Sequence, residues 1–175
     1  MTEANFKKTH SLLGLGVLKI DDVDMGYSRG GGSFDFKRTA HAITADGDRG
    51  KHVGAVVLDQ EVATLTMTML ELIPENMVKL FPALKSTTLT DTTTIEPDFD
   101  LKLTDYHKVQ WTGKMMDGTL VDIIFDKAIN LDPISWAMKE KDEVTQKVVF
   151  EACYAEQTDL STYVAPYRIT YKKAV

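Results

Sequence analysis

The feature that most restricts the fold of this chain is a strict alternation of apolar and polar residues in several separate segments. In 62–70, for example, Ala63, Leu65, Met67 and Met69 alternate with three threonines. Such side chains lie on opposite faces of a strand, so one face can be buried while the other meets water or a second layer. The same pattern predicts strands at 34–42, 144–154 and 167–171, with further strand candidates at 15–20 and 53–58.

A hairpin is predicted where Asp117-Gly118 separates two alternating segments, 106–116 and 119–129. An Asp-Gly pair between strands favours a tight turn, because both central residues of such a turn adopt positive φ. A two-residue turn would pair Met116 with Thr119, and this pairing sets the predicted register of the whole hairpin.

In that register Trp111 lies opposite Ile124 on one face, and Val121, Ile123 and Phe125 lie on the other face. Both faces are then partly apolar, which a sheet with one wet face does not need. We therefore expect both faces of this hairpin to be packed, one against the core and the other against a helix or a neighbouring subunit.

One short helix is predicted to begin at Pro74, since proline is favourable at a first helical position and Glu75 suits the positive N-terminal end. Pro82 should end it. A further strand is expected at 134–139, with a turn at 140–142. Three segments are read as turns or loops: the glycine-rich 28–33, the charged 45–52, and the threonine-rich 86–94, which could also be an edge strand.

These elements predict a mainly β fold, a β-sandwich or partial barrel with one short flanking α-helix. A chain of 175 residues has the length of one domain. We expect an N-terminal arm at 1–13 and a single β-rich domain at 14–175.

The net charge of −6 lies entirely in residues 61–175, since the acids and bases of residues 1–60 balance. An acidic chain is a poor candidate for gripping DNA, which needs a basic surface. The first ten residues lack the apolar stretch of a signal peptide, and no apolar run approaches a membrane-spanning length, so synthesis in the cytoplasm without a membrane partner is expected.

Motifs for catalysis or cofactor binding are incomplete in this sequence. Gly14-x-Gly16 lacks the third glycine of a dinucleotide fingerprint, and Asp46-Gly47-Asp48 lacks the later residues of a calcium loop. The four histidines have no metal-ligand spacing, and Cys153 is the single cysteine. We therefore expect no enzyme activity, no cofactor and no metal, and we interpret Cys153 as a half-buried structural residue.

The order of elements resembles the tail tube (major tail) proteins of tailed bacteriophages and related tailocin particles. The likeness rests on ADGDRG after the long strand, the helix Glu-Asn-x-x-Lys-Leu, and the closing pattern FEA-x-Y … PYRI-x-Y. It implies a β-sandwich or partial barrel that forms hexameric rings, which stack into a tube around a lumen. The implied location is the virion tail. The implied partners are further copies of the chain, the tape-measure protein, tail-tip and terminator proteins, a sheath if the tail is contractile, and DNA that passes without specific binding.

The resemblance also suggests contact residues. It implies that the 45–52 loop projects towards the next ring, where Asp46, Asp48, Arg49 and Lys51 offer both charge signs; an exposed tip without a partner is the alternative. The hairpin face with Val121, Ile123 and Phe125 is the expected subunit-packing surface. A secretion-system tube would share this architecture. The competing class is a monomeric β-sandwich that binds a ligand through Trp111 or Trp136, with a hydrolytic enzyme as the third.

Overall fold

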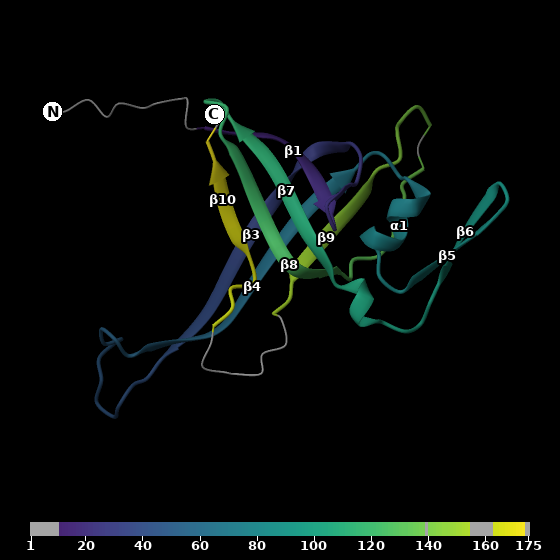
Figure 1. Ribbon diagram of the computed structural model, residues 1–175. Coiled ribbons are helices and arrows are strands. Elements are labelled where there is room, and N and C mark those ends of the chain that lie inside the picture. The colour runs from purple at the N-terminus through teal and green to yellow at the C-terminus, as the bar shows by residue number, and fades with distance from the viewer. Residues whose placement is uncertain (1–10, 139, 155–162, 174–175) are drawn as a thin grey trace.

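The computed structural model describes residues 11–138, 140–154 and 163–173. The described part of the chain is mainly β, with antiparallel sheets and one short α-helix, as the sequence predicts (Figure 1). The elements in chain order are β1 (Leu12–Ile20), β2 (Val23–Asp24), β3 (Ser28–Ala42), β4 (Val56–Met69), α1 (Pro74–Leu80), β5 (Leu84–Leu89), β6 (Thr92–Pro97), a 3-10 turn (Leu103–Asp105), β7 (His107–Met115), β8 (Leu120–Asn130), β9 (Gln146–Ala152) and β10 (Arg168–Lys172).

One large sheet has the strand order β2-β1-β7-β8-β9-β4-β3, and β10 pairs with β8. This sheet curves until β1 and β3, which are far apart in the strand order, contact one another. The result is a partial barrel in which β8 pairs with β9 at one end and with β10 at the other (Figure 1). β5 and β6 form a separate hairpin beside α1.

The inside of the partial barrel is the hydrophobic core. Alternate residues of β4, β7, β8 and β9 point inwards, which is why the period-two pattern is so clear in the sequence. The most deeply buried hydrophobic side chains of these strands and of β1 are Leu18, Ile20, Ala63, Met69, Val109, Phe125, Ala128, Val148 and Phe150.

Helix α1 covers one end of this core. Pro74 lies in its first turn, Met77 and Leu80 are buried, and the helix ends at Leu80, before Pro82, as predicted. Its last turn is tied to the sheet, because the Asn130 side-chain amide donates to the Leu80 carbonyl oxygen over 2.7 Å.

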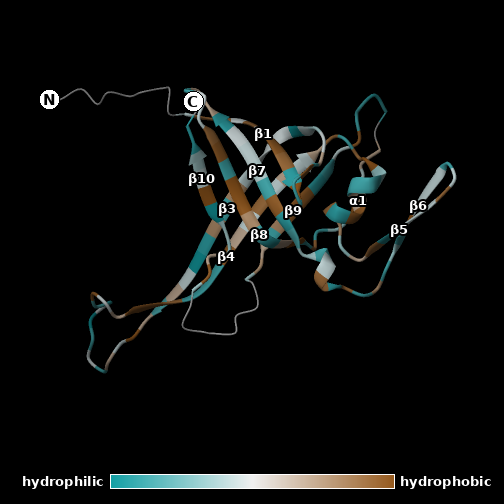
Figure 2. Ribbon diagram, in the orientation of Figure 1, coloured by the Kyte–Doolittle hydropathy of each residue, from teal (hydrophilic) through white to brown (hydrophobic). Residues whose placement is uncertain are grey.

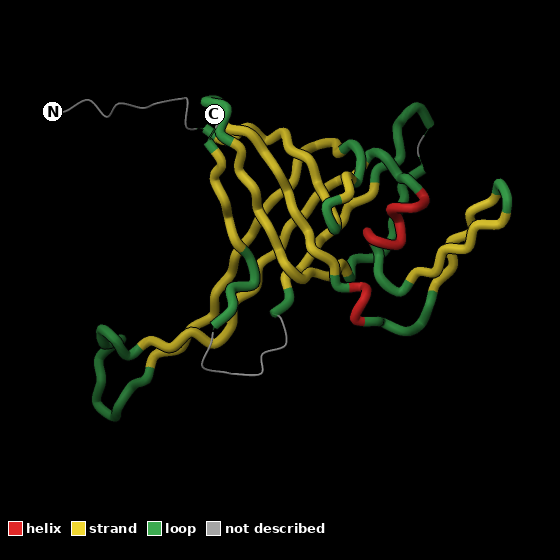
Figure 3. The backbone as a smooth tube through the Cα atoms, in the orientation of Figure 1, coloured by secondary structure: helices red, strands yellow, loops and turns green. Residues whose placement is uncertain are grey.

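β3 and β4 are the longest strands, with 15 and 14 residues, and they run out of the barrel as a two-stranded ribbon (Figures 1 and 3). We call residues 37–61 the ribbon and residues 43–55 its tip. β4 pairs with β9 between Thr64 and Met69, so in the described part of the chain residues 56–63 of β4 pair with β3 alone.

The predicted strands at 144–154 and 167–171 are confirmed to within two residues at each end as β9 and β10. Those at 34–42 and 62–70 are confirmed as parts of β3 and β4, which both begin six residues earlier, and the 15–20 candidate lies in β1. The 53–58 candidate is not separate, because its second half is the start of β4. The threonine-rich 86–94 segment lies in the β5–β6 hairpin. β1 begins at Leu12, two residues inside the predicted N-terminal arm, most of which lies outside the described residues.

Two predictions of local structure are wrong. Residues 28–33 belong to β3: the register with β4 shifts between Ser28 and Gly32, and Gly30 and Gly31 have φ of 79° and 77°, so these glycines form a bulge. The predicted strand at 134–139 is irregular backbone in its described residues (Figure 3).

The predicted hairpin register is wrong by one residue. The Met115 N–H donates to the Thr119 carbonyl oxygen over 2.8 Å, which leaves a three-residue loop ending at Gly118, whose φ is 90°. Trp111 consequently lies opposite Ile123 and Gln110 lies opposite Ile124. A three-residue loop with glycine in the left-handed position is the next most common hairpin connection after the two-residue turn.

Candidate functional site

The ribbon exposes apolar side chains that have no core of their own. Val53 at the tip is fully exposed, and Leu58 is 55% exposed. Val56 and Leu58 pair with Ala42 and Ala40, so these four residues form an apolar strip along one face of the ribbon. Figure 2 shows hydrophobic residues continuing along the ribbon towards the polar tip. The remaining large apolar residues of the ribbon with exposed side chains are Ile43 and Val57.

The tip holds the four residues of the predicted contact loop, and all four are exposed. Asp48 shapes the tip itself: its carboxylate accepts from the Ala45 N–H over 2.7 Å and lies 3.0 Å from His52 Nε2. These two contacts lower the pKa of Asp48. Asp46, Arg49 and Lys51 form no ion pair with any residue that the structure describes, so their charges are directed at solvent.

Glu61 fixes the root of the ribbon to the segment that follows β9. The Tyr163 hydroxyl donates to Glu61 Oε2 over 2.5 Å, and the Tyr154 hydroxyl donates to the same oxygen over 3.3 Å. Arg38 Nε lies 2.8 Å from Glu61 Oε1. The Tyr163 hydrogen bond, together with the bonds from Arg38 and Tyr154, outweighs the cost of burial and lowers the pKa of Glu61. The same hydrogen bond raises the pKa of Tyr163 to about 12.

The three residues predicted to pack against a neighbouring subunit lie instead in the chain's own interior. Val121, Ile123 and Phe125 are 3%, 8% and 0% exposed, and Ile123 and Phe125 belong to the core. The one-residue register error exchanged the two faces of β8, because neighbouring residues of a strand point in opposite directions. This corrects the expected packing role of all three side chains.

The outer face of the β7–β8 hairpin is polar around Asp122, which is 1% exposed. Thr112 donates to Asp122 Oδ1 over 2.7 Å, and Lys172 Nζ from β10 lies 2.6 Å from Oδ2. Burial alone would raise the pKa of Asp122, but Lys172 and Thr112 together hold it below its usual value. Asp122 is therefore a buried carboxylate that is kept charged by β10.

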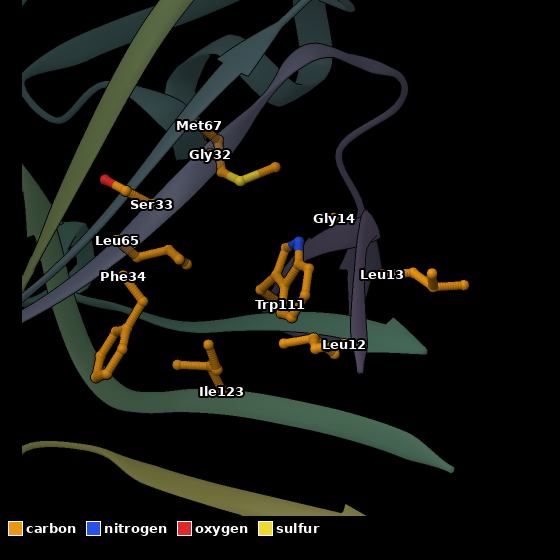
Figure 4. Close-up of a pocket in the computed structure, with 10 residues that line it drawn as sticks. All are labelled: Leu12, Leu13, Gly14, Gly32, Ser33, Phe34, Leu65, Met67, Trp111 and Ile123. Carbon is orange, nitrogen blue, oxygen red and sulfur yellow. The ribbon is translucent and has the colours of Figure 1, made fainter. Parts of the chain in front are cut away.

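Trp111 lies over two facing glycines inside the barrel, Gly16 of β1 and Gly113 of β7. Its indole borders an apolar cavity of about 210 Å³ between β1, β3 and β4 (Figure 4). The cavity is lined mainly by Leu12, Phe34, Leu65, Met67 and Ile123. Among these lining residues only Ser33 has a side-chain oxygen, and its hydroxyl points away from the indole and donates to Asp35 Oδ2 over 3.0 Å, so the cavity has few groups with which to orient a polar ligand (Figure 4).

Trp136 lies at a second apolar hollow, of about 420 Å³, between α1 and the β5–β6 hairpin. Trp136 is 43% exposed, whereas Trp111 is 8% exposed. Of the two tryptophans that were candidates for a ligand face, Trp136 alone is accessible.

Among the described residues, no group of three or more histidine, cysteine, aspartate and glutamate side chains is placed to hold a metal ion. Cys153 is half-buried, and its burial raises the pKa of the thiol. In the described ranges we also find no helix with the length and apolar character needed to cross a membrane.

Comparison with known proteins found no protein-family model and no curated protein that matches this chain. A proposal for its function therefore rests on the residues and geometry above.

Sequence reasoning missed the apolar strip of the ribbon and the Glu61 contacts. The run Val56-Val57-Leu58, directly after a polar loop, is a local signal for the strip, because a strand with one wet face would carry a polar residue in the middle. No local signal exists for Glu61, whose partner Tyr163 is 102 residues away.

Proposed function

We propose that this chain is a structural subunit of the tail tube of a tailed bacteriophage or tailocin. In this proposal copies of the chain assemble into hexameric rings, and the rings stack into a channel for the tape-measure protein and for DNA. The chain would act without catalysis or a cofactor, and it would meet tail-tip and terminator proteins at the ends of the tube.

The observation that carries the proposal is the unsupported ribbon. An isolated two-stranded hairpin is marginally stable in water, and exposed apolar strands invite pairing with another chain. Yet the ribbon keeps Val56 and Leu58 on one exposed face and is held in a fixed direction by Glu61 at its root. A ribbon with these properties is best explained by a cover that another copy supplies.

The arrangement of the ribbon within the molecule also supports a repeating assembly. The ribbon leaves the barrel on one side, and α1 and the β5–β6 hairpin lie on the opposite side (Figure 1). A contact in which one surface of a subunit meets a different surface of the next copy is heterologous. Such contacts generate rings or open filaments. The exposed charges of Asp46, Arg49 and Lys51 at the tip suit a contact between stacked rings.

The test is light scattering behind size exclusion on the purified chain, with negative-stain microscopy of the same peak and of concentrated protein. Rings or tubes with an open channel are the expected particles. A chain that stays monomeric at every concentration, and also when mixed with a tail-tip complex, would refute the proposal.

Two variants locate the contact. Deletion of residues 46–50 should leave a folded monomer that forms no tubes, and normal tubes from this deletion would remove the tip from the mechanism. Val56→Ser with Leu58→Ser should also abolish assembly while changing the unfolding free energy by less than about 1 kcal/mol, because both side chains are exposed. Gln60→Ser, on a polar and exposed position of the same ribbon, is the matched control and should assemble normally.

The second candidate is a monomeric ligand-binding module, and the exposed Trp136 beside its apolar hollow is the observation that favours it. Trp136→Ala separates the two functions. Loss of ligand binding with an unchanged monomer would support the module, and unchanged tube formation by this variant would support the tube.

A further inference from the structure

The last described segment, residues 163–173, docks onto the barrel through a small set of side-chain contacts. Its strand, β10, pairs with β8 and with no other strand that the structure describes. None of the five β10 side chains is buried; the exposed ones include Ile169 and Tyr171. β10 is therefore held by backbone pairing and by charge, and not by a core of its own.

The charges on β8 and β10 match in spacing and in register. Asp122 and Asp126 lie four residues apart on β8, and Arg168 and Lys172 lie four residues apart on β10. Arg168 Nη1 and Nη2 donate to the two carboxylate oxygens of Asp126, over 2.5 and 2.7 Å, and Lys172 Nζ lies 2.6 Å from Asp122 Oδ2.

In both ion pairs the cation reaches past its directly opposite residue to the acid two positions further along β8. Arg168 is opposite Ile124 and reaches Asp126, and Lys172 is opposite Leu120 and reaches Asp122. Both ion pairs therefore run along the same diagonal between the two strands.

Two tyrosines complete the contact. Tyr163 binds Glu61 at the root of the ribbon. The ring of Tyr167 lies edge-on to Phe34 and Phe36 of β3, with centroids 5.0 and 4.7 Å apart. These side-chain contacts of residues 163–173 are all made to strands β3, β4 and β8, which precede the segment in the chain.

We propose that residues 163–173 form an exchangeable strand, and that the slot on β8 marked by Asp122 and Asp126 accepts this same segment from a second copy of the chain. Each of these contacts can form between two copies as well as within one, so the local concentration of subunits decides which form is populated. Charge complementarity selects the occupant: a strand with two cations four residues apart. The proposal does not rest on the tube function, because exchange can be measured between two subunits in solution.

The test mixes two full-length charge variants. The slot variant carries Asp122→Lys and Asp126→Arg, and the strand variant carries Arg168→Asp and Lys172→Asp. Each variant repels its own strand, whereas the two together offer complementary pairs in both directions. Native mass spectrometry should detect separate chains in each single solution and a heterodimer of about 1:1 in the mixture, in an amount that falls as salt screens the pairs.

A chain that carries all four substitutions is the control, since it restores attraction within one molecule. It should fold like the parent and form the same species as the parent at the same concentration. A mixture without heterodimer, beside a folded four-fold control, would overturn the proposal.

A second measurement covers the case in which the buried Asp122 substitution prevents folding. Leu120 and Lys172 are directly opposed, at a separation that suits a disulfide. In a Cys153→Ser background, chains with Leu120→Cys are mixed with chains with Lys172→Cys and oxidised. A disulfide between positions 120 and 172 of different chains, enriched at least about tenfold over the mixture in urea, supports exchange. Enrichment no greater than in urea overturns the proposal.

Discussion

Replacement of Gly16 by alanine should destabilise the fold through a single side chain, that of Trp111. The backbone of Gly16 is not left-handed, so an alanine is conformationally acceptable there. Its Cβ, however, would lie 2.3 Å from Trp111 Cε2. Ordinary contact begins at 3.4 Å, so the indole has to move by about 1.1 Å.

The cavity beside the indole limits the cost of this movement. A space of about 210 Å³ adjoins the ring, so the ring can shift without displacing the backbone. Overpacking of a core typically costs about 1–3 kcal/mol. Replacing glycine by alanine at a compatible position returns about 0.4–1 kcal/mol by restricting the unfolded chain. The net expected destabilisation is about 1–2 kcal/mol.

Gly14 is the matched control, because it lies two residues away on the same strand and a Cβ there meets nothing within 4 Å. Gly14→Ala should be neutral or stabilising by up to about 1 kcal/mol. The assay is urea unfolding followed by far-ultraviolet circular dichroism, at a concentration where light scattering finds monomers.

Trp111→Leu provides the decisive background. With the indole removed, Gly16→Ala should no longer lower the unfolding free energy and should have the same effect as Gly14→Ala. The difference between the two backgrounds corresponds to a coupling free energy of about 1–3 kcal/mol between positions 16 and 111. If Gly16→Ala is as destabilising beside Leu as beside Trp, the steric reasoning is refuted.

Three further changes test other parts of the structure. Asn130→Ala should cost about 2–4 kcal/mol in urea unfolding, because the 2% exposed amide satisfies the Leu80 carbonyl oxygen and the Asp132 N–H; a cost below about 1 kcal/mol would contradict this role. Phe125→Ala, at a fully buried core position, should cost about 3–5 kcal/mol in the same assay. The pKa of Tyr163 is raised to about 12, so its bond to Glu61 stabilises the fold fully below the unfolded value near 10 and is lost as the pH rises through 12. Tyr163→Phe should therefore flatten the parent's fall in stability between about pH 10 and pH 12, and an unchanged fall would refute the assignment.

The strands were predictable because burial on one face leaves a local trace. In β4, Ala63, Leu65, Met67 and Met69 are buried and the threonines between them are half-exposed, so each residue reports its own face. The helix was predictable for the same reason: Pro74 and Pro82 restrict its ends through local sterics. How the strands are ordered in the sheet was not local information, since β4 pairs with β9 some eighty residues further on.

The errors arise where a glycine allows two local solutions. Gly118 suits both a two-residue and a three-residue hairpin loop. The choice between them decides which residues of β8 share a face with Trp111. Gly30 and Gly31 suit a turn as well as a bulge, and only the pairing of Ser28 with Met69 decides for the bulge. Of the candidate site, the exposed charged tip could be predicted from composition, whereas the Glu61 contacts depend on residues distant in the chain.

The contact between Glu61 and Tyr163 affects when the ribbon can become fixed during protein synthesis. The two residues are separated by 102 positions. At about 5–20 residues per second, a ribosome needs roughly 5–20 s to pass from one to the other. Throughout that interval the nascent chain carries a ribbon whose root lacks its tyrosine partner. We therefore expect a ribbon with a defined direction only in chains whose translation has passed residue 163, so that newly completed chains associate and growing ones do not.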